Sequence, residues 1–508
     1  MKVHNYMFYD VISRNTRIYP DKTAIVFENV QLSYKEYKKK CDCLAAGLLG
    51  AGIVKGDRIA VIAQNSDKFL ILYGAAAKIG AIILPVNWRM QQYEVEHIIC
   101  DARPKFVFTG SDYQEMIAEI VKKYPSVEKC YTLDEHLREG FSSFDSLYMP
   151  VNTEDCADID GNDGFVLMYT AAVNGKPRGA LLSQTNVIAI NMEMTDQYQL
   201  SGEDCNLCFL PLFHIAGLSM CMAIMQNGGR NVIMARFDAG NALQLIAEEK
   251  VSVFFNFSPI LKMITDKYEE KKVDLSSVRK VGGLESLENM ERFGKIAKNV
   301  KFYTAYGQTE AMAITGGPMD ERPGSAGRPS ILANIVLFDD FDNAVPVGTP
   351  GEICVRSPAV FCGYWELDEE NLQTFRNGWH HTGDIGRFDE DGFLWYMKRK
   401  AQKDLIKPGG ENVYPAEVEK AILAHECVAE VCVIGVSDKE WGEAIKAVAV
   451  PRSGKQSVTL QELADFLADR IARYKKPKYL VWVNSLPRAT TGEIDREKVK
   501  ELHGQSLS

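Results

Sequence analysis

Residues 168–182, MYTAAVNGKPRGALL, join a predicted apolar strand to a predicted helix through small and flexible residues. Loops of this kind hold phosphate groups, because glycines let the backbone turn its N–H groups toward an anion. Gly175 and Gly179 are the glycines here, and Lys176 and Arg178 add positive charge. The same residues also fit an ordinary strand-to-helix turn with surface cations, so this stretch alone leaves both interpretations open.

The composition is that of a globular protein with several cores. The chain has 508 residues, of which 46% are hydrophobic, enough for two or three domains. Its formal net charge is -10 and its pI is about 5.5. These values argue against a nucleic acid as the main partner, since binding to a phosphate backbone needs a basic surface.

The twelve cysteines are scattered among apolar neighbours, which predicts reduced, partly buried thiols of a cytoplasmic protein. Neither Cys205 and Cys208 nor Cys41 and Cys43 has a second Cys or His pair nearby, so we expect no zinc site.

No targeting or membrane-spanning segment is expected. The first six residues have neither a charged region nor a following apolar stretch, so we expect no signal peptide. The longest apolar run, 69–86, is interrupted by Lys78, Gly80 and Pro85, and it predicts a buried helix followed by a strand.

Strands and helices alternate along the first part of the chain. Segments 23–27 and 30–33 predict a hairpin, and 34–49 has a helical spacing that Gly50 and Gly52 end. The pattern then predicts a helix at 67–79 and strands at 57–63, 81–86, 105–109, 164–169 and 251–256. This is the βαβ pattern of an α/β domain.

The pattern changes at Asn334. Short segments between Asp, Gly and Pro turns predict an all-β section with strands at 335–338, 351–356 and 392–396. The charged run 398–404 precedes a small α+β unit. Such runs are often only solvated surface, but at this position we expect a linker that acts as a hinge. The predicted domains are therefore 1–399 and 400–508.

Three further motifs carry chemistry. Segment 303–310, YTAYGQTE, combines an aromatic ring, a glycine, a hydroxyl and a carboxylate, which suits stacking a base, approaching phosphate and holding a divalent ion. Segment 378–384, GWHHTGD, offers Asp384 at a predicted strand-end turn, where a carboxylate can bind ribose hydroxyls. Segment 407–419, KPGGENVYPAEVE, is a glycine loop that enters a helix.

These motifs, together with 210–214 (LPLFH), occur in the order and approximate spacing of the adenylate-forming family. The chain resembles the acyl-CoA synthetases of that family, which also includes luciferases and peptide-synthetase adenylation domains, over nearly its whole length. The resemblance implies an α/β fold: a large N-terminal domain of two α/β subdomains plus a distorted β-barrel, followed by a small, mobile α+β C-terminal domain.

The resemblance also implies an AMP-forming ligase that uses ATP, Mg²⁺ and coenzyme A (CoA). A carboxylate attacks the α-phosphate of ATP to give an acyl-adenylate and pyrophosphate. The C-terminal domain then rotates, and a thiol attacks the acyl carbon. Because the first step brings two anions together, Mg²⁺ and cationic side chains must neutralise their repulsion. The partners are thus small molecules, and the sequence leaves a homodimer open.

The family's site residues carry over to matching positions. By resemblance, Thr309 contacts phosphate, Glu310 holds Mg²⁺, Tyr306 stacks on adenine beside Gly307 and Gln308, and Asp384 and Arg399 hold the ribose. The phosphate loop opens at Thr170 and includes Asn174, Gly175, Lys176 and Arg178. The swing of the C-terminal domain, with Ala401 or Lys403 as pivot, presents Gly409, Gly410 and Glu411 to the thiol-transfer site.

The same resemblance places the acyl pocket among Phe213, His214, Gly217, Leu218, residues 256–259, Gly282, Gly283 and Leu284, with Ala305 near its floor. His214 is either an ordinary histidine at a strand end or a residue at the mouth of the acyl site, and the resemblance favours the second. These segments contain no lysine or arginine for a second substrate carboxylate, so we expect a monocarboxylate with a neutral, apolar or aromatic body.

The phosphate loop departs from the family pattern. Residues 171–174, AAVN, replace a Ser/Thr/Gly-rich run, and Arg178 replaces a lysine. Each lost hydrogen bond contributes about 0.5–1.5 kcal/mol, so we expect weaker contact with pyrophosphate.

A more serious departure is Glu493, which stands where the family has the catalytic lysine that bridges the substrate carboxylate and the α-phosphate. A unit-charge pair about 4 Å apart at a dielectric near 20 is worth about 4 kcal/mol, so the reversed sign matters. Lys475, Lys476 and Lys478 lie upstream and are candidates to compensate. Two functions stay open: a CoA ligase with an altered site, or a member that binds acyl-CoA or adenylate with little ATP-driven activation.

Overall fold

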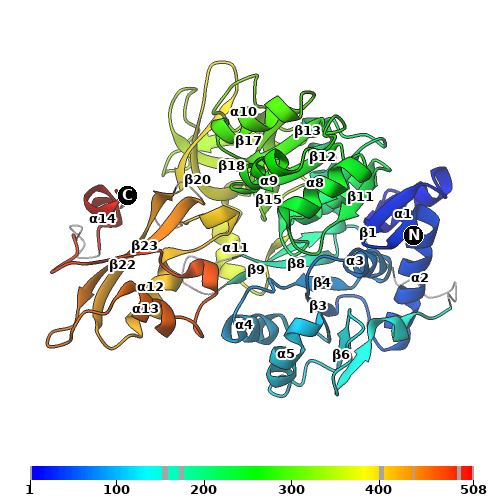
Figure 1. The fold of residues 1–508 in the computed structure, drawn as a ribbon, viewed down its shortest axis with the longest axis horizontal. Coiled ribbons are helices and arrows are strands. Elements are labelled where there is room, and N and C mark those ends of the chain that lie inside the picture. Colours follow the sequence, from blue (N-terminus) through cyan, green and yellow to red (C-terminus); the bar gives the residue numbers. More distant parts are fainter. Residues whose placement is uncertain are drawn as a thin grey trace.

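The computed structural model describes residues 3–150, 158–170, 177–399, 405–438, 441–488 and 494–505 of the 508-residue chain. Two large sheets, a four-stranded sheet and a C-terminal three-stranded sheet make up the molecule. The C-terminal unit lies at the opposite end of the molecule from the N-terminal helices (Figure 1).

An eight-stranded sheet has the order β19-β9-β8-β4-β3-β5-β6-β7, and its strands from β8 to β7 are parallel. The strands are β3 (Arg58–Ile62), β4 (Ile82–Pro85), β5 (Phe106–Thr109), β6 (Lys129–Thr132), β7 (Phe141–Ser143), β8 (Gly164–Thr170), β9 (Arg178–Ser183) and β19 (Gly363–Tyr364). The connecting helices are α3 (Asp67–Ile79), α4 (Gln92–Ala102), η1 (Ser111–Tyr113), α5 (Gln114–Val121) and η2 (Phe144–Leu147). The strands predicted at 57–63, 81–86, 105–109 and 164–169 are confirmed.

The helix predicted at 67–79 is α3, and local chemistry fixes both of its ends. The Ser66 hydroxyl accepts a hydrogen bond from the Phe69 N–H, which caps the first turn. Gly80 follows the last turn with a φ of 70°, a left-handed conformation that glycine adopts without strain.

A nine-stranded sheet has the order β16-β15-β14-β13-β12-β10-β11-β1-β2, with parallel strands from β14 to β1. Its strands are β1 (Thr23–Phe27), β2 (Val30–Ser33), β10 (Cys205–Cys208), β11 (Arg230–Ile233), β12 (Val253–Phe257), β13 (Lys280–Leu284), β14 (Lys301–Gln308), β15 (Ala311–Pro318) and β16 (Arg328–Pro329). The helices are α1 (Phe8–Ile18), α2 (Tyr34–Gly50), α6 (Gln184–Tyr198), α7 (Ile215–Gln226), α8 (Ala239–Glu248), α9 (Ile260–Glu270) and α10 (Leu287–Ile296). The predicted hairpin is β1 and β2, and the strand predicted at 251–256 is β12.

The two large sheets share one core. A single cluster of buried apolar residues includes Tyr73 of α3, Phe165 of β8, Met194 of α6 and Phe254 of β12. The two α/β subdomains therefore pack through apolar side chains.

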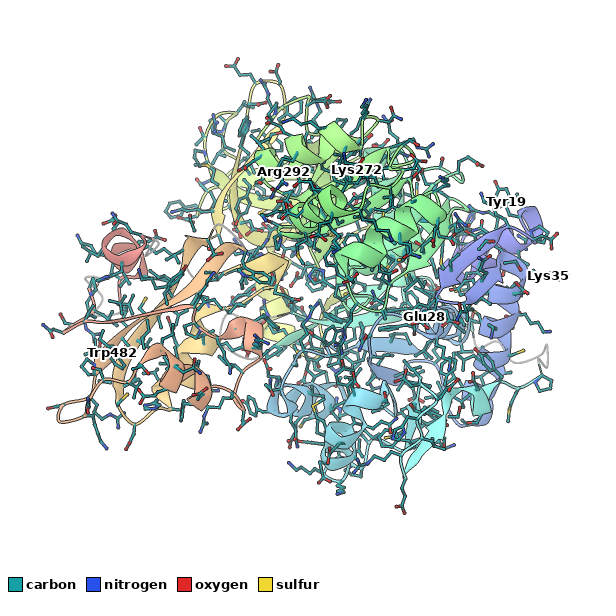
Figure 2. The ribbon with its side chains drawn as sticks, in the orientation of Figure 1. Tyr19, Glu28, Lys35, Lys272, Arg292 and Trp482 are labelled. Carbon is teal, nitrogen blue, oxygen red and sulfur yellow. The ribbon has the colours of Figure 1, made fainter. Side chains whose placement is uncertain are left out.

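Polar contacts join helices farther from this core. Arg292 of α10 donates hydrogen bonds to Asp266 and Glu269 of α9 at 2.8 and 2.9 Å (Figure 2).

The all-β section predicted after Asn334 is confirmed, as an open sheet of order β17-β18-β20-β21. Its strands are β17 (Asn334–Phe338), β18 (Gly351–Arg356), β20 (His380–Phe388) and β21 (Leu394–Arg399), with α11 (Asp368–Thr374) and η3 (Arg376–Gly378) before β20. β17 and β21 form its two edges, so the sheet differs from the expected barrel in not closing within the described residues.

The C-terminal unit has its own core beneath the sheet β22-β23-β24. Its elements are η5 (Pro408–Gly410), α12 (Pro415–Leu423), β22 (Val428–Asp438), β23 (Gly442–Pro451), α13 (Leu460–Phe466), η6 (Arg473–Lys475), β24 (Tyr479–Trp482) and α14 (Arg496–His503). Trp482 packs on this core and donates its indole N–H to the Val458 oxygen at 2.9 Å (Figure 2). The predicted α+β class is confirmed. The boundary at 399/400 and its hinge stay predictions, because 400–404 lie outside the described residues.

The predicted connection after β8 is wrong in one respect. β9 pairs antiparallel with β8, with Thr170 opposite Arg178, so the glycine-containing loop joins two strands and not a strand to a helix. The helix α6 begins only at Gln184, where the Ser183 hydroxyl accepts from the Asn186 N–H. The apolar run after Arg178 fits a strand because it packs on the core and continues the sheet to β19.

No helix in the described ranges is both long and apolar enough to cross a membrane. Most cysteines in those ranges are buried, as predicted.

Glu193 of α6 is a buried acid. It has no exposed surface, its Oε1 accepts from the Ser357 hydroxyl at 3.3 Å, and its Oε2 has no hydrogen-bond partner in the described part of the chain. Burial raises the pKa of Glu193 to about 8, whereas Ser357 opposes this shift. The folded protein therefore holds a proton that the unfolded chain releases above pH of about 4.5, and its stability falls as the pH rises toward 8.

We expect Glu193→Gln to remove this part of the pH dependence. Between pH 6 and 8 the wild-type free energy of unfolding should fall by up to about 1.4 kcal/mol per pH unit relative to the variant. Urea unfolding across this range measures the difference. Glu203→Gln, whose side chain is 88% exposed, is the control. Equal pH slopes for wild type and Glu193→Gln would contradict a buried, protonated Glu193.

Candidate active site

Asp384 is the centre of one set of hydrogen bonds. It lies inside β20 with 2% of its surface exposed. Arg399, the last residue of β21, donates from Nε to Asp384 Oδ1 at 2.7 Å. The Tyr306 hydroxyl donates to Oδ2 at 2.8 Å, and Gln308 Nε2 lies 3.4 Å from the same oxygen. The nine-stranded sheet and the four-stranded sheet thus meet at this carboxylate.

The prediction that Asp384 lies at a strand-end turn is wrong. β20 pairs with β18 on one side and β21 on the other, so the strand continues through Asp384. Gly383 has a φ of 75°, and this local irregularity explains why the sequence resembles a turn.

Two tyrosine hydroxyls flank the Asp384 and Arg399 pair. Burial and the neighbouring Asp384 raise the pKa of Tyr306 well above its ordinary value, so its phenol stays protonated and donates to Asp384. Arg399 Nη1 lies 3.2 Å from the hydroxyl of Tyr414, the residue before α12. The C-terminal unit therefore reaches this part of the site.

Thr309 and Glu310 form the tight turn between β14 and β15. Glu310 Oε1 accepts from the Tyr364 hydroxyl at 2.9 Å and from Thr170 Oγ1 at 3.3 Å. The turn thus lies beside Thr170 at the end of β8. It directly follows β14, the strand that carries Tyr306. Glu310 comes two residues after Gln308, whose side chain lies 3.4 Å from Asp384, so the two carboxylates lie in the same region of the molecule.

Gly307 has no room for a side chain. It lies where the β14–β15 register shifts, and a Cβ there would stand 2.8 Å from the Ala311 oxygen. Close packing of the backbone around the turn therefore requires a glycine at this position of the motif.

Arg178 is the first residue of β9, and its guanidinium contacts other side chains. Its Nη1 pairs with Glu370 at 2.5 Å, and its Nη2 donates to the Tyr364 hydroxyl at 3.1 Å. The guanidinium lies 3.9 Å from the centre of the Tyr364 ring. Since Tyr364 donates to Glu310, Arg178 helps to position that carboxylate. Its predicted phosphate contact stays a prediction. Asn174, Gly175, Lys176 and Glu493 lie outside the described residues.

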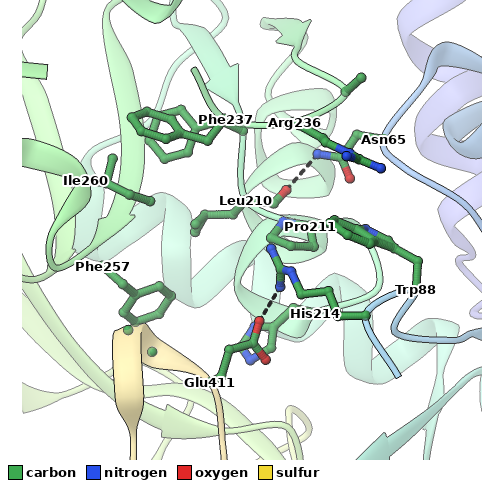
Figure 3. A pocket seen from close by; sticks show the side chains of 15 residues that line it. Asn65, Trp88, Leu210, Pro211, His214, Arg236, Phe237, Phe257, Ile260 and Glu411 are labelled. Carbon is green, nitrogen blue, oxygen red and sulfur yellow. Dashed lines mark hydrogen bonds and ion pairs between the residues drawn. The ribbon is translucent and has the colours of Figure 1, made fainter. Parts of the chain in front are cut away.

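The glycine loop of the C-terminal unit lies against the N-terminal domain. Gly410 has a φ of 85°, and a Cβ there would stand 2.9 Å from Cγ of Phe257, so this approach requires glycine. Glu411 forms an ion pair with Arg89, and Figure 3 shows Glu411 next to His214 on one side of the loop and Phe257 on the other.

This loop closes one side of a cavity of about 300 Å³. The cavity is lined by Asn65, Trp88, Arg89, Phe209, Leu210, Pro211, His214, Ala235, Arg236, Phe237, Phe257, Ile260, Gly409, Gly410 and Glu411 (Figure 3). A second, smaller cavity of about 60 Å³ shares His214 and Glu411 with the first, and its walls also include Thr170, Phe213, Thr309 and Lys475. Thr170 and Thr309, which belong to the predicted phosphate site, therefore line a cavity next to the one that the glycine loop closes.

His214 lies at the start of α7 and not at a strand end, and its place at the mouth of an acyl site stays a prediction. Its Nδ1 accepts from the Ala216 N–H at 3.2 Å, which caps α7, and its ring lines both cavities. Burial lowers the pKa of His214, and the nearby Glu411 only partly opposes this shift. The imidazole is therefore neutral near pH 7.

Nine predicted pocket residues line neither cavity: Gly217, Leu218, Asn256, Ser258, Pro259, Gly282, Gly283, Leu284 and Ala305. Three of them are tightly packed. A Cβ on Gly217 would stand 2.8 Å from the Leu210 oxygen, one on Gly282 would stand 2.8 Å from the Tyr198 hydroxyl, and one on Gly283 would meet the Asn256 backbone. Their role in an acyl pocket stays a prediction.

Sequence reasoning missed the opposite wall of the larger cavity. Trp88 stacks between the guanidinium groups of Arg89 and Arg236, 4.7 and 4.9 Å from the ring centre. The signal was available, because Trp88 and Arg89 come two and three residues after the strand predicted at 81–86. Ligands of α/β sheets bind at the carboxyl ends of parallel strands.

Lys475 joins the two parts of the molecule through a buried ion pair. Its ammonium contacts Glu94 of α4 and lies 2.6 Å from Glu417 of α12, and it is 2% exposed. Burial alone would lower the pKa of Lys475, but Tyr474, Glu417 and Glu94 outweigh burial and raise it. Lys475 is thus committed to two carboxylates in this arrangement.

Known families and proteins match the chain along its length. Residues 12–365 match the family described as AMP-binding enzyme, and residues 417–493 match the AMP-binding enzyme C-terminal domain. A feruloyl-CoA synthase of Amycolatopsis sp. is 31% identical over 97% of this chain and 98% of its own. An indoleacetate–CoA ligase of Aromatoleum aromaticum is 31% identical over 97% of both chains.

A solved structure has the same fold over the same extent. It is a double mutant of the o-succinylbenzoate CoA synthetase of Bacillus subtilis, bound to a product analogue. The TM-score is 0.84, with 27% identity over 98% of each chain.

We expect loss of the Lys475 ammonium to loosen the contact between α4 and α12. Lys475→Met leaves two carboxylates buried without their cation, and breaking such a pair is worth about 3–5 kcal/mol. Amide hydrogen exchange of peptides 92–102 and 415–423 should accelerate by at least about 100-fold. The control is Lys478→Met, because Lys478 pairs with Asp438 at 2.7 Å and is 44% exposed. Equal exchange in both variants would contradict this role of Lys475.

Proposed function

The chain belongs to the family of AMP-binding enzymes, and from this premise we propose that it joins a monocarboxylic acid to CoA through an acyl-adenylate. Membership in the family confirms the predicted resemblance and the predicted class of enzyme, an ATP-dependent ligase that forms AMP. The observation that carries the proposal is the convergence of Asp384, Arg399 and Tyr306 with the Thr309–Glu310 turn beside a cavity that the glycine loop closes.

Adenylation uses the residues around Asp384 and the hydroxyl groups that line the smaller cavity. Asp384, oriented by Arg399 and Tyr306, is suited to accept hydrogen bonds from ribose hydroxyls. Thr309 and Thr170 line the smaller cavity with hydroxyl groups that suit phosphate. The carboxylate of the acid attacks the α-phosphorus, a P–O bond forms, and pyrophosphate leaves.

Glu310 and the hydroxyls of Thr170 and Thr309 also form a set of oxygen donors, which fits Mg²⁺ in chemical type. Mg²⁺ held by Glu310 would neutralise charge as the carboxylate approaches ATP. Arg178 holds Tyr364 against Glu310 and so keeps this carboxylate in place.

Thioester formation uses the larger cavity. The CoA thiol gives up its proton to the solvent and attacks the acyl carbon, a C–S bond forms, and AMP leaves with the electron pair of the broken C–O bond. The neutral His214 lies at the junction of the two cavities, and the Gly409–Glu411 loop excludes water on the opposite side. Packing of this loop on Phe257 supports the view that the observed arrangement serves the thiol step, and that adenylation requires the C-terminal unit to swing.

The acid is proposed to have a neutral, apolar or aromatic body. Phe209, Phe237, Phe257 and Ile260 supply apolar walls. Arg89 is paired with Glu411, and Arg236 lies 3.2 Å from Asp112, so both cations near the cavity already have carboxylate partners. Relatives named for feruloyl and indoleacetate groups support an acid with an aromatic body.

A second candidate is a protein that binds acyl-CoA or adenylate with little ATP-driven activation. The presence of Glu493 in place of a lysine favours it. In addition, Lys475 cannot replace that lysine while it pairs with Glu94 and Glu417. The ligase remains the better candidate, because the residues predicted for ribose, Mg²⁺ and the CoA side remain in the chain.

Glu493→Lys separates the two candidates. Restoring a cation should increase carboxylate-dependent ATP–pyrophosphate exchange, by up to about a thousandfold if about 4 kcal/mol of repulsion is relieved. Thioester formation from supplied acyl-adenylate should change little, because it uses the other orientation. Glu497→Lys, an exposed charge reversal at the start of α14, is the control. Unchanged exchange, or loss of a robust wild-type exchange, would contradict the role assigned to Glu493.

A further inference from the structure

A wedge opens between β13 and β14. Their pairing runs from Lys280 opposite Lys301 to Gly282 opposite Tyr303 and then stops, although β13 continues to Leu284 and β14 to Gln308. The two strands therefore separate at their carboxyl ends, the edge at which parallel sheets bind ligands. The apex of the wedge is the pair Gly282 and Tyr303.

Tyr198, the last residue of α6, covers this apex. It is fully buried, and its ring centre lies 5.3 Å from that of Tyr303 and 6.0 Å from that of Phe255, the register partner of Gly282. Gly282 leaves the space that the Tyr198 side chain occupies, since a Cβ there would stand 2.8 Å from its hydroxyl oxygen. The end of the wedge is therefore filled by one phenol.

The Tyr198 hydroxyl has no hydrogen-bond partner among the described residues. Burial raises its pKa well above the ordinary value, so the group stays a protonated donor. A buried donor without an acceptor is unfavourable and rare in folded proteins. An acceptor supplied by a ligand would satisfy it.

A row of rings connects the larger cavity to Tyr198. Phe257 lines the cavity and lies 6.4 Å from the His214 ring, Phe255 lies 5.6 Å from Phe257, and Tyr198 follows. Ala305, two residues beyond Tyr303 on the opposite strand, lies on the other side of the wedge. Ala305 therefore contributes only a methyl group to this side of the wedge.

We propose that Tyr198 is the floor of the acyl site and determines its specificity in two ways. Its ring limits the length of the acyl group, and its hydroxyl donates a hydrogen bond to an oxygen acceptor at the distal end of that group. The acid is then a compact one with a distal hydroxyl, oxo or ether oxygen. This inference rests on the proposed function, because it assumes that the acyl group enters past His214 and Phe257.

Inert acyl-sulfamoyl-adenosines test the proposal without requiring catalysis. Calorimetry would compare 4-hydroxycinnamoyl, cinnamoyl and dodecanoyl analogues on the wild type, Tyr198→Phe and Tyr198→Ala. The wild type should prefer the hydroxylated analogue over cinnamoyl by about 3- to 10-fold, the value of one neutral hydrogen bond, and Tyr198→Phe should abolish this preference. Tyr198→Ala should bind the dodecanoyl analogue at least about 10-fold more tightly than the wild type does.

Tyr131→Phe, at a buried tyrosine of the eight-stranded sheet, is the matched control and should behave as wild type. If the analogues bind but the variants leave both preferences unchanged, the assignment of Tyr198 is overturned and the proposed function stands. If no analogue binds the wild type, the adenylate site fails and both proposals fall.

Discussion

The buried ion pair of Lys475 with Glu94 and Glu417 is the contact on which the arrangement of the site depends. Two carboxylates share one ammonium away from water, and the desolvation of these charges offsets much of their attraction. The group therefore specifies an orientation more than it adds stability. With α12 fixed against α4, the glycine loop reaches Phe257 and Glu411 reaches Arg89.

In this orientation, the remaining polar groups form two separate sets, one around Asp384 and one around Glu310. Asp384, Arg399 and Tyr306 form a rigid set in which each partner restricts the others. Glu310 is held from two other strands, through Thr170 and through Tyr364. Pre-oriented groups of this kind lower a barrier because they need no rearrangement when charge moves. In the proposed mechanism the C-terminal unit is the part that swings, and in the observed arrangement it brings the glycine loop, Tyr414 and Lys475 to the site.

Local chemistry decided how much of this could be predicted from the sequence. The helix predicted at 67–79 agrees with α3, and the structure shows that Ser66 and Gly80 end it on the two sides. The loop after Thr170 was assigned to a helix start because a short apolar strand such as β9 resembles a helix turn at this length. Motif spacing grouped Glu310 with Asp384, but no local pattern could pair Lys475 with Glu94, 381 positions away. Tyr198 also has no motif around it in the sequence, and only its buried position shows that its hydroxyl lacks a partner among the described residues.

The central claim is that a carboxylate oxygen attacks the α-phosphorus of ATP. The direct measurement is mass spectrometry of the nucleotide after turnover of 4-hydroxycinnamate, labelled with oxygen-18 in its carboxylate, with ATP, Mg²⁺ and CoA. We expect AMP that carries one labelled oxygen together with unlabelled pyrophosphate, since the attacking oxygen leaves with AMP when the thiol displaces it. Unlabelled AMP, or ADP with labelled phosphate, would contradict it.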